Sequence, residues 1–246
     1  MERYKLTFAY EGTNYFGSQR QETTPTVQRA LENALSCIGW QGDSILLAGR
    51  TDTGVHASGQ VAAFDFEWQH DPEELLRAIN AKLPTDIAVT QISIVPREFH
   101  PRFDASSRVY SYRIYCQPIR DPFRERLAWR QWPPLNGRLL DQAAEVLIGT
   151  HDFAAFGTPP RKEQSTIRNL YLANWSLEGD EWKFTIQANA FLYHMVRRLV
   201  FFQVAIAQGR LPLSLLGKLL KEPKQKAISG LAPSNGLTLI KVTYPE

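Results

Sequence analysis

The sequence predicts an α+β fold made of two ferredoxin-like halves, each with the element order β-α-β-β-α-β. Three observations support this class: strand and helix periodicities alternate along the 246 residues, turn residues separate them, and the second half repeats the order of the first. The expected halves are residues 1–104 and 105–246. We expect their mainly antiparallel sheets to join side by side, with an active-site cleft between the halves.

Periodicity justifies each element of the first half. Tyr4, Leu6, Phe8 and Tyr10 alternate with other residues, which is typical of a strand with one buried face. The pair Asp71-Pro72 favours a helix start, because a capping residue precedes a proline at the first helical position. The expected elements are a strand at 4–10, a helix at 27–38, strands at 44–48 and 60–67 around a polar loop at 49–59, a helix at 71–83 and a strand at 87–95.

The second half repeats this order. Its expected elements are a strand at 109–116, a helix at 139–148, strands at 167–177 and 181–188 joined by a turn at 178–180, a helix at 191–208, a short helix after Pro212 and a strand at 237–244. The helix at 191–208 is largely apolar but contains His194, Arg197 and Gln203. We therefore expect it to be buried in protein and not to span a membrane.

Composition narrows the class of protein. The chain is 43% hydrophobic and 22% charged, as in ordinary globular proteins, and its charged start is unlike a signal peptide. The two cysteines, Cys37 and Cys116, lack metal-ligand spacing and fit a reducing cytoplasm. The histidines are scattered along the chain, so no metal site is expected.

Charge is distributed unevenly between the halves. Residues 1–104 contain nine Lys and Arg against 14 Asp and Glu, a net charge of −5, whereas residues 105–246 contain 19 against 11, a net charge of +8. A basic second half can hold phosphates, but solvated surface charge explains the count equally well. The asymmetry permits RNA binding without establishing it.

The polar loop that starts at Gly49 brings together charge, hydroxyls and glycines. Gly49 and Gly54 both permit unusual backbone dihedrals that can orient a carboxylate. Arg50 can pair with Asp52 and keep it ionised, and a fixed carboxylate in a cleft serves as nucleophile or general base. On residue chemistry alone, an aspartate that only caps a turn is the commoner case.

Long sequence motifs run through the chain in a fixed order. GRTDTGVHASGQVAAF, which contains Asp52, resembles the active-site loop of the tRNA pseudouridine synthase A family. Further stretches that match the family in order are YEGTNYFGSQRQ, FHPRFDASSRVYSYRIY, HDFAAF, TIRN, ANAFLYHMVR and NGLTLIKVTYP. Because the matches cover the chain nearly end to end, it is identified as a member of this family.

The resemblance implies a cofactor-free reaction on RNA. Uridine in the anticodon stem-loop of tRNA, at positions 38, 39 and 40, is isomerised to pseudouridine, so atoms and oxidation state are conserved and no cofactor or metal is expected. The resemblance implies Asp52 as the nucleophile, Arg50 as its partner and Tyr110 as the tyrosine that stacks on a flipped base. Attack at ribose C1′, attack at uracil C6 and assisted elimination all remain open. Tyr112 and Tyr115 are assigned to the core.

Further site residues follow from the resemblance and from charge. Leu237 or Leu239 matches the apolar wall beside the uracil, although a strand facing the core has the same pattern. The candidate RNA contacts are Arg20, His56, Arg161, Lys162, Arg168 and Arg197. Members of the family act as homodimers on tRNA, so we expect a homodimer with tRNA as its partner and neither a membrane nor DNA.

The sequence departs from the family pattern at two positions. Ser18 stands where tryptophan is usual, and Phe201 stands where glycine is usual. Neither is one of the three catalytic candidates, so activity is expected. One alternative function is a non-catalytic RNA-binding or RNA-folding module on the same fold. Another is a hydrolase that uses Asp52 with His56, for which the sequence offers no third group.

Overall fold

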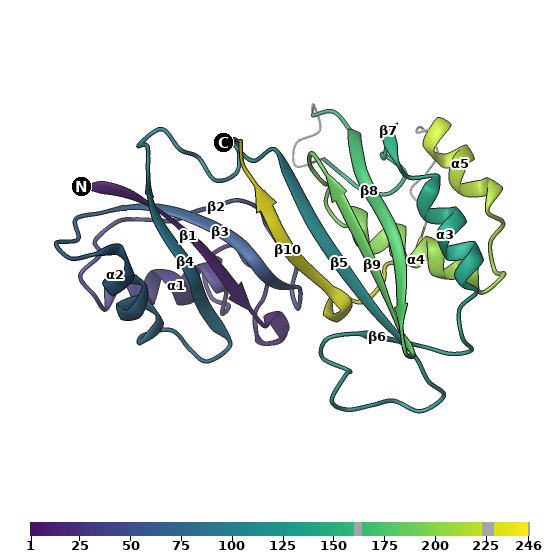
Figure 1. The fold of residues 1–246 in the computed structure, drawn as a ribbon, viewed down its shortest axis with the longest axis horizontal. Helices are drawn as coiled ribbons and strands as arrows, with labels where there is room; N and C mark the ends of the chain where they lie inside the picture. Colours follow the sequence, from purple (N-terminus) through teal and green to yellow (C-terminus); the bar gives the residue numbers. More distant parts are fainter. Residues whose placement is uncertain (160–163, 223–228, 246) are drawn as a thin grey trace. The chain divides into compact units, whose positions relative to one another are not determined.

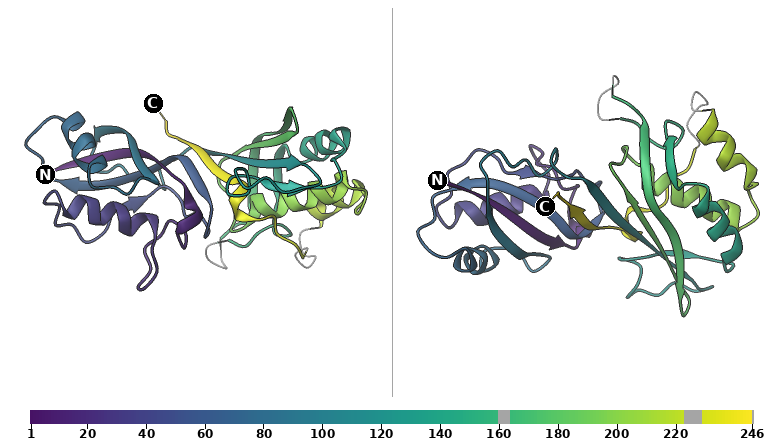
Figure 2. Two further views of the ribbon diagram at one scale, coloured as in Figure 1. Left: turned by 90° about the horizontal axis from the view of Figure 1, so that it is seen from below. Right: turned by 45° about the horizontal axis from the view of Figure 1, so that its top comes forward.

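The computed structural model describes residues 1–159, 164–222 and 229–245, which form two compact units (Figure 1). The first unit contains Met1–Ser106 and the residues from Thr238 onward, and the second contains Ser107–Leu237. Both units combine mainly antiparallel strands with helices, which confirms the predicted α+β class (Figures 1 and 2). None of the described helices has the length and apolar character needed to cross a membrane.

The first unit has the predicted order of strands and helices. Its elements are β1 (Glu2–Tyr10), the short 3-10 helix η1 (Gly12–Asn14), α1 (Val27–Ser36), β2 (Leu46–Leu47), β3 (His56–Phe66), α2 (Pro72–Asn80), β4 (Ile87–Val95) and β10 (Leu237–Thr243). β1 lies between β4 and β3 and is antiparallel to both, and β2 pairs antiparallel with β3. The unit is therefore ferredoxin-like, as predicted.

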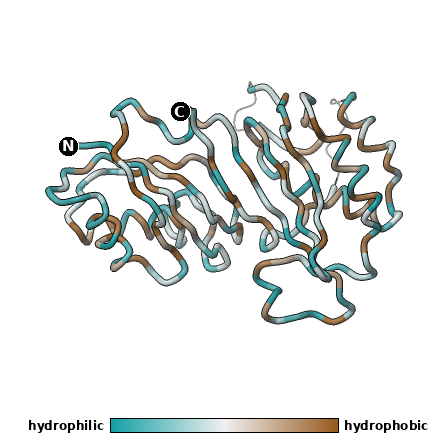
Figure 3. Tube along the Cα trace, in the orientation of Figure 1, coloured by the Kyte–Doolittle hydropathy of each residue, from teal (hydrophilic) through white to brown (hydrophobic). Residues whose placement is uncertain are grey.

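The core of the first unit follows from the alternation in β1. The four alternating side chains from Tyr4 to Tyr10 are at most 4% exposed. Burial of an apolar side chain of this size contributes about 1.5–3 kcal/mol, so the alternation decides which face of the sheet is covered. α1 begins where the side chain of Thr26 accepts the N–H of Arg29. Hydrophobic and hydrophilic stretches alternate along the strands and helices (Figure 3).

The pairing of β3 fixes both ends of the loop that contains Asp52. One edge of β3 pairs with β1, and its other edge is shared between β2, at Ala62 and Ala63, and β10, which runs parallel at His56 and Ala57. The loop leaves the sheet where β2 ends and returns at His56. It is therefore shorter than the predicted 49–59, and only two residues of the predicted strand at 44–48 are paired.

The last strand differs from the prediction in the unit that it joins. The sequence placed residues 237–244 in the second half, but β10 from Thr238 onward belongs to the first unit, where it pairs with β3. Its end is also bound there. The N–H of Ser106 donates to the carbonyl of Thr243 at 2.8 Å, and the Tyr244 hydroxyl donates to the carbonyl of Pro101 at 2.7 Å.

The second unit repeats the strand arrangement of the first. Its elements are β5 (Ser107–Cys116), β6 (Trp129–Gln131), α3 (Gly137–Glu145), β7 (Gly149–Asp152), β8 (Ile167–Glu178), β9 (Glu181–Ala188), α4 (Met195–Ala207), α5 (Ser214–Lys221) and η2 (Ser234–Gly236). β5, β9, β8 and β7 pair antiparallel in that order, and β6 runs parallel to β5. β5, β9 and β8 thus correspond to β1, β3 and β2. The sequence did not predict β6 and β7.

Helix α4 is shorter than predicted at its start. His194 has φ 65°, a left-handed conformation that no α-helix continues through, so the helix begins at Met195 and not at Phe191. Most of α4 is buried, as expected. Phe201, the second departure from the family pattern, stacks on Trp129 with ring centroids 6.5 Å apart. It also occupies the space that a side chain at Gly230 would need.

An ion pair between β1 and β3 gives a pH-dependent prediction. Arg3 donates to both carboxylate oxygens of Asp65, at 2.7 and 2.8 Å, and this hydrogen bonding lowers the pKa of Asp65. Because the pair is partly solvated, we expect Asp65→Asn to lower the free energy of unfolding by about 1 kcal/mol at pH 7. A lowered native pKa stabilises the fold above the pKa of the unfolded chain, about 3.9, and this contribution is lost as pH falls further.

Urea denaturation at pH 7 and at pH 3 measures this effect. The difference between wild type and Asp65→Asn should shrink towards zero at pH 3, and the exposed Asp141→Asn control should match wild type at pH 7. An equal difference at both pH values would contradict the assignment.

Candidate active site

The residue before Asp52 is fixed by three hydrogen bonds. The N–H of Thr51 donates to Ser18 Oγ at 2.9 Å, and the N–H of Ser18 donates to the carbonyl of Thr51 at 3.1 Å. The Thr51 hydroxyl is 2.8 Å from the Tyr10 hydroxyl in a buried contact. Thr51 is buried and Asp52 is partly buried. The backbone on one side of Asp52 is therefore anchored to β1 and to the segment that follows it.

The residues after Asp52 form a turn that is also anchored. The N–H of Val55 donates to the carbonyl of Asp52 at 3.1 Å, and the N–H of Gly54 donates to the carbonyl of Tyr15 at 3.3 Å. Gly54 has φ 75°, as the sequence led us to expect of a glycine here. Gly49, the other glycine singled out on sequence grounds, is not among the glycines with positive φ.

Gly12 and Gly17 allow two motifs that are distant in sequence to lie in contact. A side chain at Gly17 would approach the carbonyl of Thr51 to 2.8 Å, and one at Gly12 would approach the carbonyl of Val55 to 2.0 Å. The motif that begins at Tyr10 therefore lies against the Asp52 loop at backbone distance. Glycine is needed at these positions because a Cβ would push the loop away.

Arg50 has a different environment from the one considered on sequence grounds. Its side chain is exposed, and the ion pairs found in the described ranges include none between Arg50 and Asp52. The loop is thus held by backbone and hydroxyl contacts and not by this pair.

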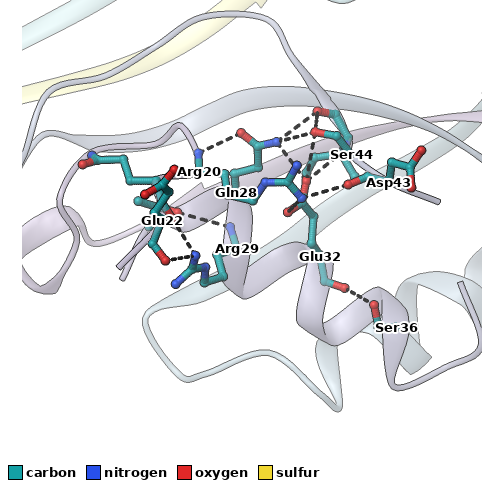
Figure 4. Close-up of polar contacts among 11 residues, drawn as sticks. Arg20, Glu22, Gln28, Arg29, Glu32, Ser36, Asp43 and Ser44 are labelled. Atoms are coloured by element: carbon teal, nitrogen blue, oxygen red, sulfur yellow. Dashed lines mark hydrogen bonds and ion pairs between the residues drawn. The ribbon is translucent and has the colours of Figure 1, made fainter. Parts of the chain in front are cut away.

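His56 and Arg20, two candidate RNA contacts, make contacts within the first unit. His56 is 4% exposed, and its Nδ1 accepts the N–H of Gly12 at 2.9 Å. A ring that accepts through Nδ1 has no free lone pair there for general-base catalysis, so this contact disfavours the hydrolase alternative. Arg20 Nη1 donates to Glu32 Oε2 at 3.1 Å and to the carbonyl of Asp43 at 2.8 Å (Figure 4).

Three tyrosines of β5 differ in burial. Tyr112 and Tyr115 are 0% exposed, which confirms their assignment to the core, and the Tyr112 hydroxyl donates to the carbonyl of Pro233 at 2.7 Å. Burial raises the pKa of Tyr112. Tyr110 is only partly buried, and its ring meets that of Phe191 edge to face at 5.1 Å. Tyr110 thus differs from the other two in keeping partial exposure.

The remaining candidates lie in both units. Arg197 Nε donates to the carbonyl of Ala232 at 2.7 Å. Arg168 Nη1 donates to the carbonyls of Ser165 and Ile167, and burial lowers its pKa. Leu237, in the second unit, and Leu239, in the first, are both buried in β10. Arg161 and Lys162 lie outside the described residues.

Some of the basic charge of the second half is neutralised internally. Arg124 donates to Asp180 at 2.8 Å and to Glu181 at 3.2 Å, and Arg113 also donates to Glu181. These bonds hold the loop after β5 against the turn between β8 and β9. The number of basic residues in this half therefore overstates how many are available to contact a polyanion, whereas the net charge already takes these pairs into account.

Comparison with known proteins places these residues in a family context. A family model described as tRNA pseudouridine synthase matches residues 6–104 and 143–245. The matched ranges include Asp52 and Arg197 and leave out residues 105–142, where Tyr110 lies. Within the described residues, no group of three or more His, Cys, Asp and Glu side chains is arranged to hold a metal ion.

The chain also resembles individual proteins over its whole length. It is 40% identical to tRNA pseudouridine synthase A of Methylacidiphilum infernorum, over 98% of this chain and 95% of that protein. It is 37% identical to tRNA pseudouridine synthase A of Limosilactobacillus fermentum, over 99% and 96%. A crystal structure of a Cbf5-Nop10-Gar1 complex matches 96% of this chain and 48% of that chain at 10% identity, but its TM-score of 0.40 is too low to support an argument.

The two glycines of the Asp52 loop provide a matched test of its backbone. Gly54→Ala forces a side chain into a left-handed conformation and should lower the free energy of unfolding by about 1–2 kcal/mol. Gly49→Ala meets open space without positive φ and should change it by less than about 0.5 kcal/mol. Chemical denaturation measures both, and equal effects would contradict the loop geometry.

Proposed function

Because the chain belongs to the tRNA pseudouridine synthase family, we propose that it isomerises uridine to pseudouridine in tRNA with Asp52 as the nucleophile. The observation that carries the assignment of Asp52 is its position in the loop. A partly buried carboxylate lies between a residue with three hydrogen bonds and an anchored turn. A carboxylate fixed in this way is suited to covalent catalysis.

The proposed reaction requires a well-positioned carboxylate and not a redox group. The bond from ribose C1′ to uracil N1 breaks and a bond from C1′ to C5 forms, while C5 loses a proton and N1 gains one, so that no atom is added or removed. Attack of Asp52 at C1′, attack at C6 and assisted elimination all start from the same carboxylate. In each case the rate depends on how well that carboxylate is held near the reacting atom.

We place Tyr110 beside the reacting base. A uridine in a stem has to be flipped out, which costs a few kcal/mol, and stacking on an aromatic ring offsets about 1–3 kcal/mol of that cost. Tyr110 is the partly exposed tyrosine of its strand, and its edge-to-face contact with Phe191 fixes the ring. Its phenol can also relay the proton from C5, because the oxygen accepts that proton as the hydroxyl passes its own proton on. Leu237 or Leu239 would line the apolar side of the uracil pocket.

The proposed substrate site is the anticodon stem-loop, at positions 38, 39 and 40, bound by a cytoplasmic homodimer. Arg168 and Arg197 are the described candidates for RNA contact in the basic half, together with Arg161 and Lys162. Arg50 is exposed beside Asp52 and would fill the space that the flipped base vacates. Arg20 is the weakest candidate, because Glu32 already holds it.

Position-resolved mapping of pseudouridine tests the function directly. Unmodified tRNA incubated with the protein should gain pseudouridine at positions 38, 39 and 40. A non-catalytic RNA-binding or RNA-folding module would bind the same tRNA and leave every uridine unchanged, which would overturn the proposal.

Asp52→Asn tests the nucleophile. The amide keeps nearly the same shape and cannot attack carbon as a carboxylate does, so we expect pseudouridine formation to fall below detection. Affinity for tRNA should stay within about tenfold, or 1.4 kcal/mol. Filter binding and mapping on the same preparation measure both quantities, and an active Asp52→Asn protein would refute the assignment.

Tyr110→Phe tests the phenol separately from the ring. The phenylalanine keeps the stacking surface, so tRNA binding should be unchanged, and the loss of the hydroxyl should reduce turnover by about 100-fold or more, as is typical when a general base is removed. Single-turnover rates measure this. Unchanged turnover would limit Tyr110 to stacking.

A further inference from the structure

We infer that Ser18 is a positioning residue for Asp52, which it controls by fixing the backbone of Thr51. This inference rests on the proposed role of Asp52. Ser18 is 0% exposed, so it makes its contribution entirely inside the first unit.

The two hydrogen bonds between Ser18 and Thr51 form a closed pair. Ser18 Oγ accepts the Thr51 N–H at 2.9 Å, and the Thr51 carbonyl accepts the Ser18 N–H at 3.1 Å. Both the N–H and the carbonyl of Thr51 are therefore hydrogen-bonded to Ser18. Because Asp52 is the next residue along, the orientation of the peptide that carries its N–H is set by Ser18.

Ser18 is itself held by the start of α1. Its carbonyl accepts the N–H of Gln28 at 2.9 Å, and two residues later the N–H of Arg20 donates to Gln28 Oε1 at 3.0 Å. Gln28 Nε2 in turn donates to Glu32 Oε1 at 2.9 Å, and Glu32 accepts Arg20 (Figure 4). The segment that contains Ser18 is thus bound to one face of α1 by backbone and side chain together.

The side chain of Glu32 makes this support rigid. It is only 8% exposed, and Oε1 also accepts the N–H of Ile45 at 3.1 Å and the Ser44 hydroxyl at 3.2 Å. A buried carboxylate with this many donors has a single favourable position. Rigidity therefore extends from α1 through Ser18 to Thr51.

A hydroxyl is what this position requires. Removal of the acceptor leaves the Thr51 N–H without its partner in a buried place, and the loop then has to move or stay unsatisfied. A displacement of about 1 Å at a reacting group lowers rates by about 100-fold. Ser18 is fully buried, so we expect the loss to fall on the chemical step and not on binding.

Ser18→Ala tests the inference, with Ser36→Ala as the matched control. Ser36 lies on the last turn of α1, the helix that holds the Ser18 segment. Its hydroxyl donates to the carbonyl of Glu32 at 2.9 Å, within the helix and not to the Asp52 loop. We expect Ser18→Ala to lower the single-turnover rate on tRNA by about 10- to 100-fold and to leave the dissociation constant within about threefold. Ser36→Ala should match wild type in both. Wild-type turnover for Ser18→Ala, or a loss of affinity equal to the loss of rate, would overturn the inference.

Ser18→Cys covers the case in which the alanine protein is insoluble. The thiol fills nearly the same space but accepts hydrogen bonds weakly, so the rate should fall as in Ser18→Ala. A Ser18→Cys protein with the wild-type rate would overturn the inference.

Hydrogen exchange separates this inference from the proposed function. The Thr51 amide should be protected in wild type and should exchange at least about tenfold faster in Ser18→Ala, while the protection of the amides in β1 is unchanged. A wild-type protein that makes no pseudouridine would overturn the proposed function. The exchange of Thr51 would then still decide whether Ser18 holds the loop, because unchanged protection would overturn that role.

Discussion

The hydrogen bonding of Thr51 is the constraint on which the candidate active site depends. Both backbone groups of Thr51 are paired with Ser18, and its hydroxyl meets Tyr10. Tyr10 belongs to β1, and Ser18 is bound to α1, so two elements of the first unit converge on the residue before Asp52. A loop of glycines and short polar residues has little packing of its own. The loop is held in one conformation by its contacts with the sheet and the helix. The geometry of the site therefore depends on the stability of the first unit.

The strands of the first unit were predictable because alternation records which face is buried, and the chain order then fixed the ferredoxin-like pairing. The first and last residues of the Asp52 loop were not predictable. β3 begins at His56, where β10 pairs with it, and β10 comes from the other end of the sequence. No local pattern records such a partner. The start of α4 was missed for a similar reason: Tyr193 forms an isolated β-bridge with the distant Thr158, and His194 has a positive φ, and no local pattern records either feature.

The sequence led to a hypothesis for the chemistry of the candidate site but did not reveal the contacts that support it. Asp52 was singled out because its motif is long and distinctive. Ser18 looked like a departure of unknown effect, because its contact with Thr51 exists only once β1, α1 and the loop are folded together. Likewise, a sequence gives the charge of Arg20 but not its bond to Glu32, and gives the polarity of His56 but not its burial against Gly12. Candidate RNA contacts chosen by charge alone therefore include residues that the fold already uses.

Residue 18 also shows what the reaction asks of this loop. The family pattern usually has tryptophan there, whereas this chain has a serine that is completely buried and hydrogen-bonded to Thr51. An indole cannot accept an N–H as this hydroxyl does, so a chain with tryptophan must hold the same backbone by packing or by other donors and acceptors. In the reaction that we propose, the rate depends on where the carboxylate is placed. The position of the Asp52 backbone is then the quantity under constraint, and the side chain that fixes it is free to change as long as the loop does not move.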